Sequence, residues 1–226
     1  MSLNSPTEIA VFAICAILAI TFHEAAHGFV ALRFGDTTAK DAGRVTLNPI
    51  KHIDLFGTII LPLLLLLSAG FIFGYAKPVP VNFSALRNPR WNMIWVAVAG
   101  PAMNVALAVV SAILLRGIGV LDGENAALVG NGLLLSVELN MILAIFNMLP
   151  LPPLDGSKVI AAFLPESLRR AYLRFGRYGM TVLILLVFVV PILAAQARIR
   201  FDIFGWLVLG PAEALTRAVL SLFGHG

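Results

Sequence analysis

The feature that most constrains this chain is a series of apolar stretches of roughly membrane-spanning length. Six can be marked, at residues 7–32, 55–74, 91–115, 127–149, 179–195 and 203–223. A helix of about 20 apolar residues crosses the hydrocarbon core of a bilayer, where backbone polar groups must be satisfied within the segment. The pattern predicts an all-α polytopic membrane protein that forms a single membrane-embedded domain over residues 1–226.

Composition supports this fold class. The chain is 59% hydrophobic and 12% charged, with a mean hydropathy of +0.93, which excludes an ordinary soluble domain. Its net charge of +4 predicts contact with anionic lipid, without a nucleic-acid partner. Cys15 is the single cysteine, so neither an internal disulfide nor a cysteine-based zinc site is expected. We expect no cleaved signal peptide, because the first stretch lacks a basic leading region.

The first apolar stretch contains His23-Glu24-x-x-His27. Histidines four residues apart share one face of a helix, where two imidazoles can bind one zinc ion. Glu24 lies about 100° round the helix and suits the role of general base. The alternative is a purely structural polar cluster. Each ionisable side chain costs about 2.5–3.5 kcal/mol at the centre of a bilayer, and such residues usually mark a function.

A catalytic zinc ion needs a third protein ligand and an open position. The carboxylate candidates are Asp155, Glu138 and Asp54, whereas His52 lies in a connector and His225 close to the C-terminus. Asp155 is favoured because it follows a proline-rich turn that ends the fourth stretch and lets the backbone return toward the site. Glu138 is the reserve, with a hydrogen bond to a neighbouring helix as its alternative role.

Two amides lie in the apolar stretches. Asn147 and Asn104 could each donate a hydrogen bond to a substrate carbonyl or oxyanion, or could bond a neighbouring helix instead. For Asn147 both roles stay open, and for Asn104 the structural role is favoured. Gly100 is small enough to let two backbones approach closely.

The distribution of basic residues predicts that the second apolar stretch does not cross the bilayer. If all six stretches crossed, the 16 Lys and Arg would divide seven to nine, with no bias. If residues 55–82 form a re-entrant element, the division becomes thirteen to three. That arrangement puts the N-terminus outside and the metal site toward the cytoplasm. An ordinary second spanning helix is the alternative, since 20 apolar residues suffice to cross.

Three motifs in this order resemble the site-2 protease family of intramembrane zinc metalloproteases. They are His23-Glu24-x-x-His27, Gly100-Pro101-x-x-Asn104, and Asn147-x-x-Pro150-x-Pro152-x-Leu154-Asp155-Gly156. The resemblance covers about residues 8–160. It implies a three-helix core that holds one Zn²⁺ through His23, His27 and Asp155, with Glu24 as base. It also implies an edge strand for substrate, for which Lys77–Asn82 is the candidate.

We therefore expect a compact family member, without a PDZ-like or nucleotide-sensing domain, in the cell (inner) membrane. Two further transmembrane helices, about 179–223, follow the core. The expected activity is hydrolysis of peptide bonds in or near the transmembrane segments of membrane-anchored proteins. A divalent-metal transporter or sensor is the alternative from another class, and a catalytically inactive scaffold is a third. The sequence leaves the oligomeric state open.

Overall fold

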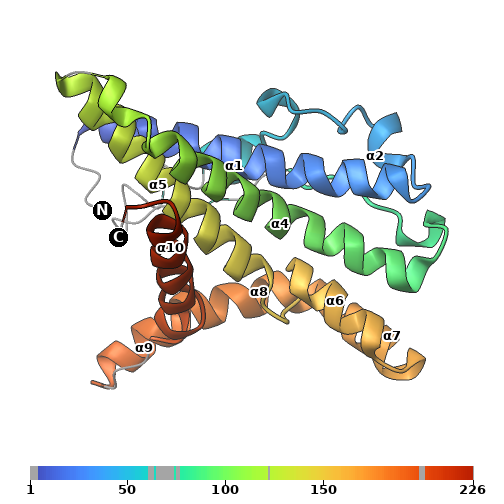
Figure 1. Ribbon diagram of the computed structural model, residues 1–226. Helices are drawn as coiled ribbons and strands as arrows, with labels where there is room; N and C mark the ends of the chain where they lie inside the picture. Colours follow the sequence, from blue (N-terminus) through green and yellow to red (C-terminus); the bar gives the residue numbers. More distant parts are fainter. Residues whose placement is uncertain are drawn as a thin grey trace. The chain divides into compact units, whose positions relative to one another are not determined.

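The computed structural model describes residues 5–60, 64, 74, 77–121, 123–198 and 202–225. Within these ranges the ordered elements are helices and helical turns, and no strand is present (Figure 1). By its internal contacts the chain divides into two units, Met1–Gly100 and Pro101–Gly226, and each is described by itself. The predicted all-α class is confirmed.

The first unit is built on α1 (Pro6–Arg33), the predicted first membrane segment. Ser5 caps the helix: its side chain accepts from the N–H of Glu8, and the Glu8 carboxylate accepts from the N–H of Ser5. The remaining elements of this unit are α2 (Thr38–Asp41), the turns η1 (Pro49–Lys51), η2 (Leu55–Ile60) and η3 (Phe83–Ala85), and the first part of α4 (Pro89–Leu115).

A small apolar cluster joins the elements of the first unit. Ala31 near the end of α1, Leu86 after η3 and Val96 in α4 are buried together. Burial of such side chains stabilises a fold by about 25 cal/mol per Å² of apolar surface removed from water. This cluster fixes α1 beside the beginning of α4, and Ala31 lies one helical turn after His27 on α1.

The second unit contains the rest of α4 and all later helices. They are η4 (Ile118–Val120), α5 (Gly123–Asn147), α6 (Asp155–Phe163), α7 (Glu166–Phe175), η5 (Gly176–Tyr178), α8 (Gly179–Ile184), η6 (Leu185–Val189), α9 (Val190–Gln196), η7 (Gly205–Leu209) and α10 (Gly210–Leu222). Its core is a cluster of small and medium side chains from α4, α5 and α10, namely Ala108, Ala112, Val137, Met141 and Ala212. Small residues at these positions let the helix backbones approach closely.

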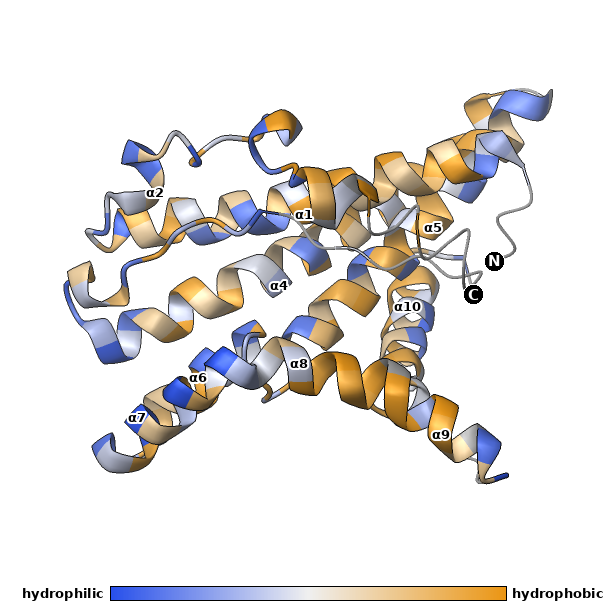
Figure 2. Cartoon of the chain, turned by 180° about the vertical axis from the view of Figure 1, so that it is seen from behind, coloured by the Kyte–Doolittle hydropathy of each residue, from blue (hydrophilic) through white to orange (hydrophobic). Residues whose placement is uncertain are grey.

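Four helical runs are long and apolar enough to cross a membrane. They are Pro6–Arg33, Pro89–Val120, Gly123–Asn147 and Glu166–Ala194. Figure 2 shows apolar residues along α1, α4, α5, α8 and α9, while α7 carries many hydrophilic ones. These runs match the first, third, fourth and fifth predicted stretches. The sixth stretch forms η7 and α10 and is not among the four, although α10 packs on α5 in the core of its unit.

The predicted re-entrant element, Leu55–Asn82, falls largely outside the described residues, which omit 61–63, 65–73 and 75–76. Its first turn is η2, a wide helical turn at Leu55–Ile60. Its last part, Lys77–Asn82, is described and was predicted as an edge strand. It is not paired with any strand among the described residues, and instead its N–H groups are bonded to other parts of the first unit.

Candidate metal centre

The two histidines of the H-E-x-x-H motif face each other on α1. Their Nε2 atoms are 3.1 Å apart, and the rings are nearly perpendicular, at 82°. Both are buried, with 6% and 8% of their surface exposed. A tetrahedral zinc ion about 2.0–2.1 Å from each nitrogen would set the two nitrogens about 3.3 Å apart. The pair is therefore already spaced for a shared ion.

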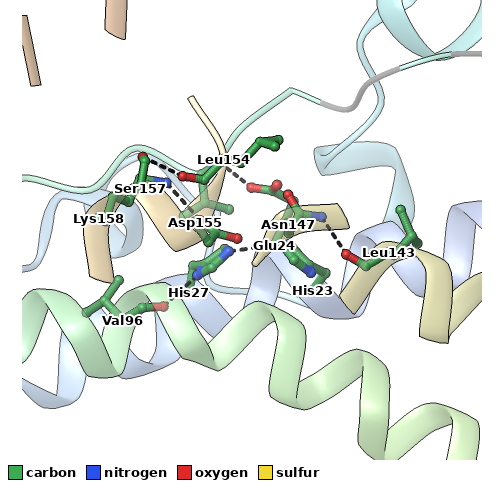
Figure 3. Close-up of polar contacts among 11 residues, drawn as sticks. His23, Glu24, His27, Val96, Leu143, Asn147, Leu154, Asp155, Ser157 and Lys158 are labelled. Atoms are coloured by element: carbon green, nitrogen blue, oxygen red, sulfur yellow. Dashed lines mark hydrogen bonds and ion pairs between the residues drawn. The ribbon is translucent and has the colours of Figure 1, made fainter. Parts of the chain in front are cut away.

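A backbone carbonyl contacts one ring nitrogen of His27 and orients the ring. His27 Nδ1 lies 2.7 Å from the carbonyl oxygen of Val96 on α4 (Figure 3). A carbonyl can only accept, so Nδ1 is the donor in this contact, and in the neutral ring Nε2 is then the nitrogen that carries the lone pair. Metal-binding histidines use this kind of contact to fix the tautomer and the ring orientation. The neutral ring thus presents the nitrogen that a metal ion requires.

Gly100 leaves the space in front of the two imidazoles open. A Cβ atom at this position would lie 2.5 Å from the Nε2 atoms of both His23 and His27. Real Cβ atoms essentially never approach other atoms so closely, so any other residue here would push the imidazoles away. The space that a side chain would fill is thus the space in front of the two Nε2 atoms.

Glu24 is held by the segment Lys77–Asn82. Its Oε2 accepts a hydrogen bond of 2.7 Å from the N–H of Val79. Val79 also lies against α1, because a Cβ atom on Gly28 would be only 3.3 Å from its Cγ1. One carboxylate oxygen of Glu24 is therefore fixed by a backbone donor. The sequence could not predict this contact, since a backbone N–H leaves no signature in the residue type.

The same segment is anchored at both ends. The N–H of Lys77 donates to the carbonyl of His52 over 3.0 Å, and the N–H of Asn82 donates to Asp36 Oδ2 over 2.7 Å. Asp36 also accepts from the N–H and the hydroxyl of Thr38 and is fully buried. Burial alone would raise the pKa of Asp36, but these hydrogen bonds to its charged form outweigh burial and hold the pKa below its ordinary value.

Asp155 belongs to the second unit, where it is the first residue of α6. It is 4% exposed, and its Oδ1 forms an ion pair of 2.7 Å with Lys158 (Figure 3). The turn before it is tight, because a Cβ atom on Gly156 would lie 2.1 Å from the carbonyl oxygen of Met148. Ser157 closes the turn by donating its hydroxyl to the carbonyl of Leu154 over 2.6 Å. The proline-rich exit of α5 thus leads directly into a fixed, buried carboxylate.

The other candidate residues are engaged differently. Asn104 is fully buried and donates to Asn140 on α5 over 2.8 Å, as expected for the structural role. Asn147 donates to the carbonyl of Leu143 on its own helix over 3.0 Å. Glu138, the reserve ligand, is exposed on α5.

The two remaining histidines hold other parts of the chain together. His52 Nε2 lies 2.9 Å from the carbonyl oxygen of Thr46, and His225 Nε2 lies 3.1 Å from that of Ala112. Neither was favoured as a ligand from the sequence. The residues that sequence reasoning missed are Val96 and Val79, which act through the backbone, and Asp36. Asp36 had a weak signal, as a carboxylate just after a helix followed two residues later by Thr38.

Comparison with known proteins gives the family. The sequence model of peptidase family M50 matches residues 11–124 and 117–190. The chain belongs to this family. It is 43% identical over 183 residues to a Bacillus subtilis (strain 168) protein named "Putative zinc metalloprotease YwhC", covering 79% of this chain and 80% of the relative. The M50 family is the site-2 protease family, so the resemblance drawn from the three motifs is confirmed.

More distant relatives carry a similar name. Two are named "Putative zinc metalloprotease Rip2". The one from Mycolicibacterium smegmatis (strain ATCC 700084 / mc(2)155) is 29% identical over 192 residues, with 84% of this chain and 70% of the relative covered. The one from Mycobacterium tuberculosis (strain ATCC 25618 / H37Rv) is 28% identical, with 78% and 66% covered. No solved structure shows a significant match. The protein is thus a zinc metalloprotease of the M50 family carried on membrane-spanning helices.

Proposed function

We propose that this M50 protein cleaves peptide bonds in or near the transmembrane segments of membrane-anchored proteins, using one zinc ion held by His23, His27 and Asp155. The observation that carries the proposal is the facing pair of Nε2 atoms with Gly100 leaving the space between them open. All three proposed ligands are buried. Two imidazoles and a carboxylate are a donor set that suits catalytic zinc.

The chain's own residues supply the proton transfers. A zinc ion at the site would polarise the scissile carbonyl and lower the pKa of a water molecule toward about 7. Glu24 has Oε2 held by the Val79 N–H, which directs its other oxygen, Oε1, to take the proton from the attacking water. The C–N bond breaks as Glu24 gives that proton to the leaving amine nitrogen. Glu24 ends the cycle ionised, as it began.

Asn147 and Asn104 remain candidates for donors to the substrate carbonyl or oxyanion. Asn147 is the better of the two, because its present partner lies on its own helix and can be exchanged by a change of side-chain rotamer. Asn104 joins α4 to α5 through Asn140, and its release would cost that contact. Stabilisation of an oxyanion by one such donor is worth about 10²–10³ in rate.

A substrate helix must unwind before its carbonyl can be attacked, and an extended partner segment would replace its lost hydrogen bonds. Lys77–Asn82 is the proposed partner. Pro78 and Pro80 have no N–H, and the N–H of Val79 is bonded to Glu24. The segment would therefore bind substrate mainly through its carbonyl oxygens, which favours a substrate stretch that is itself free of proline.

We place the protein in the cell (inner) membrane with the N-terminus outside and the site toward the cytoplasm, because this arrangement concentrates basic residues on the cytoplasmic side. Single cysteines replacing Lys77 and Arg87, in a Cys15→Ser background, test it in intact cells. Both should react with membrane-impermeant reagents only after the cytoplasmic side is exposed. Labelling from outside would contradict the orientation and the re-entrant element.

The experiment that tests the activity uses Glu24→Gln in the purified, reconstituted protein with a single-span membrane substrate. Zinc content should stay at the wild-type level, while the rate of cleavage falls by at least about 10²–10⁴. Glu8→Gln, which changes a carboxylate on the same helix at its N-terminal cap, should retain activity. Full cleavage by Glu24→Gln would contradict the mechanism, and zinc uptake into the vesicles without cleavage would favour a transporter.

A further inference from the structure

The helix α7, Glu166–Phe175, is amphipathic, yet none of its residues is buried. At about 100° per residue, Leu168, Ala171 and Phe175 share one side of the helix. Arg170 and Arg174 lie on the opposite side. Leu168 is 57% exposed and Phe175 is 42% exposed, so the apolar side is not covered by the rest of the described chain. A helix with this division, whose apolar residues Leu168 and Phe175 stay exposed within the described residues, needs another surface against its apolar side.

The charge of this segment is strongly positive. Residues 166–177 contain four arginines and one glutamate. Glu166 pairs with both Arg169 and Arg170, and the Arg170 pair is long and exposed, at 3.5 Å. One carboxylate cannot neutralise four guanidinium groups, so the basic side keeps a net charge. The segment also lies at the start of the run Glu166–Ala194, whose later part is apolar enough to cross a membrane.

We propose that α7 lies in the headgroup layer of the bilayer and binds anionic phospholipid. Its apolar side would enter the boundary between headgroups and acyl chains, and its arginines would contact the lipid phosphates. Helices with separate apolar and basic faces bind membranes in this way. Basic clusters next to a membrane span attract anionic lipid with about 1 kcal/mol per Lys or Arg, which corresponds to about fivefold in affinity for each residue.

Both α7 and the helix after it contact the proline-rich turn of the second unit. The hydroxyl of Tyr172 donates to the carbonyl of Pro150 over 2.7 Å. In the next helix, a Cβ atom on Gly179 would lie 2.0 Å from the carbonyl oxygen of Pro152, so α8 rests directly on the same turn. This turn leads to Asp155. A lipid surface that fixes α7 therefore also fixes the turn before Asp155. Any effect of this contact on catalysis rests on the proposed function, in which Asp155 binds zinc.

The depth of α7 can be measured with an environment-sensitive fluorophore on single cysteines in a Cys15→Ser background. We would place it at Leu168 on the apolar side and at Arg170 on the opposite side, with the full protein in nanodiscs. In an equimolar mixture of phosphatidylcholine and phosphatidylglycerol, the probe at 168 should be quenched by spin-labelled lipid and shielded from iodide, and the probe at 170 should not. Equal iodide quenching at both positions would overturn the proposal.

The charge requirement is tested with a matched pair of exposed arginines. Arg170 and Arg217 each lie four residues after a glutamate, with 70% and 73% of the side chain exposed. The preference for spin-labelled phosphatidylglycerol over phosphatidylcholine should fall about fivefold in Arg170→Gln and about 25-fold when Arg174→Gln is added. Arg217→Gln should leave it unchanged, and lysine at 170 and 174 should retain it. A double variant that behaves like Arg217→Gln would contradict the proposal.

Both measurements read lipid contact and do not depend on proteolysis. They can be made in the Glu24→Gln background, where the proposed catalysis is removed. If the wild-type protein cleaves its substrate but shows no preference for anionic lipid, the lipid proposal alone is rejected. If the wild-type protein shows the lipid preference but does not cleave, the proposed function alone is rejected.

Discussion

At the scale of single residues, Gly100 decides whether the two histidines can share an ion. Its missing side chain leaves the space in front of both Nε2 atoms open, and His27 is oriented for that space by the Val96 carbonyl. The sequence predicted that the two imidazoles lie together, because a spacing of four residues on a helix puts both rings on one face. It could not predict Val96, because a carbonyl contact 69 residues away leaves no mark on residue type.

Gly100→Ala should therefore remove zinc binding while α1 and α4 still form. The new Cβ atom would displace both imidazoles, and a displacement of about 1 Å at a metal site is enough to cost at least about 10²-fold in activity. Zinc affinity measured by chelator competition, with circular dichroism for helix content, checks this. Gly119→Ala is the control, since a Cβ atom there meets nothing within 4 Å. Wild-type zinc affinity in Gly100→Ala would contradict the steric argument.

At the scale of elements, the apolar helices were the predictable part. The structure confirms the first, third and fourth predicted stretches as α1, α4 and α5, because long apolar runs have one stable backbone conformation in a bilayer. The basic segment around residues 158–177 forms α6 and α7. Lys77–Asn82 was predicted as a strand, but its donors bond to carboxylates and a carbonyl of the first unit.

Asp36 is the buried anchor of this segment, and its lowered pKa gives a pH dependence that can be tested. A carboxyl group with a lowered pKa stabilises the folded state above the unfolded pKa, near 3.9, and loses that contribution as the pH falls through the folded value. Asp36→Asn should lower the melting temperature most above about pH 5, and the difference from wild type should shrink below about pH 4. The measurement is thermal unfolding in detergent across this pH range.

Asp41→Asn is the control for that comparison, because Asp41 is exposed and accepts from Thr37, the N-cap residue of the same short helix. It should change the melting temperature little at any pH. A difference between Asp36→Asn and wild type that persists unchanged down to pH 3 would show that the charge of Asp36 is not what holds Asn82.

At the scale of the whole molecule, the family, the membrane helices and the histidine pair are all consistent with zinc-dependent peptide hydrolysis at a membrane. The protein is an M50 zinc metalloprotease with four helical runs that can span a bilayer. The motif sequence alone identified the family, because three such motifs, in this order on three apolar stretches, rarely occur together by chance. The substrate could not be inferred, since the contacts that select it belong to another protein.

The proposed function requires that His23, His27 and Asp155 bind the same zinc ion. The most direct measurement is the zinc affinity of the purified protein by chelator competition, comparing Asp155→Ala with wild type, His27→Ala and Glu24→Gln. We predict one zinc per wild-type chain, a loss of at least about 10²-fold in affinity for Asp155→Ala and His27→Ala, and little change for Glu24→Gln. Wild-type affinity in Asp155→Ala would contradict the account.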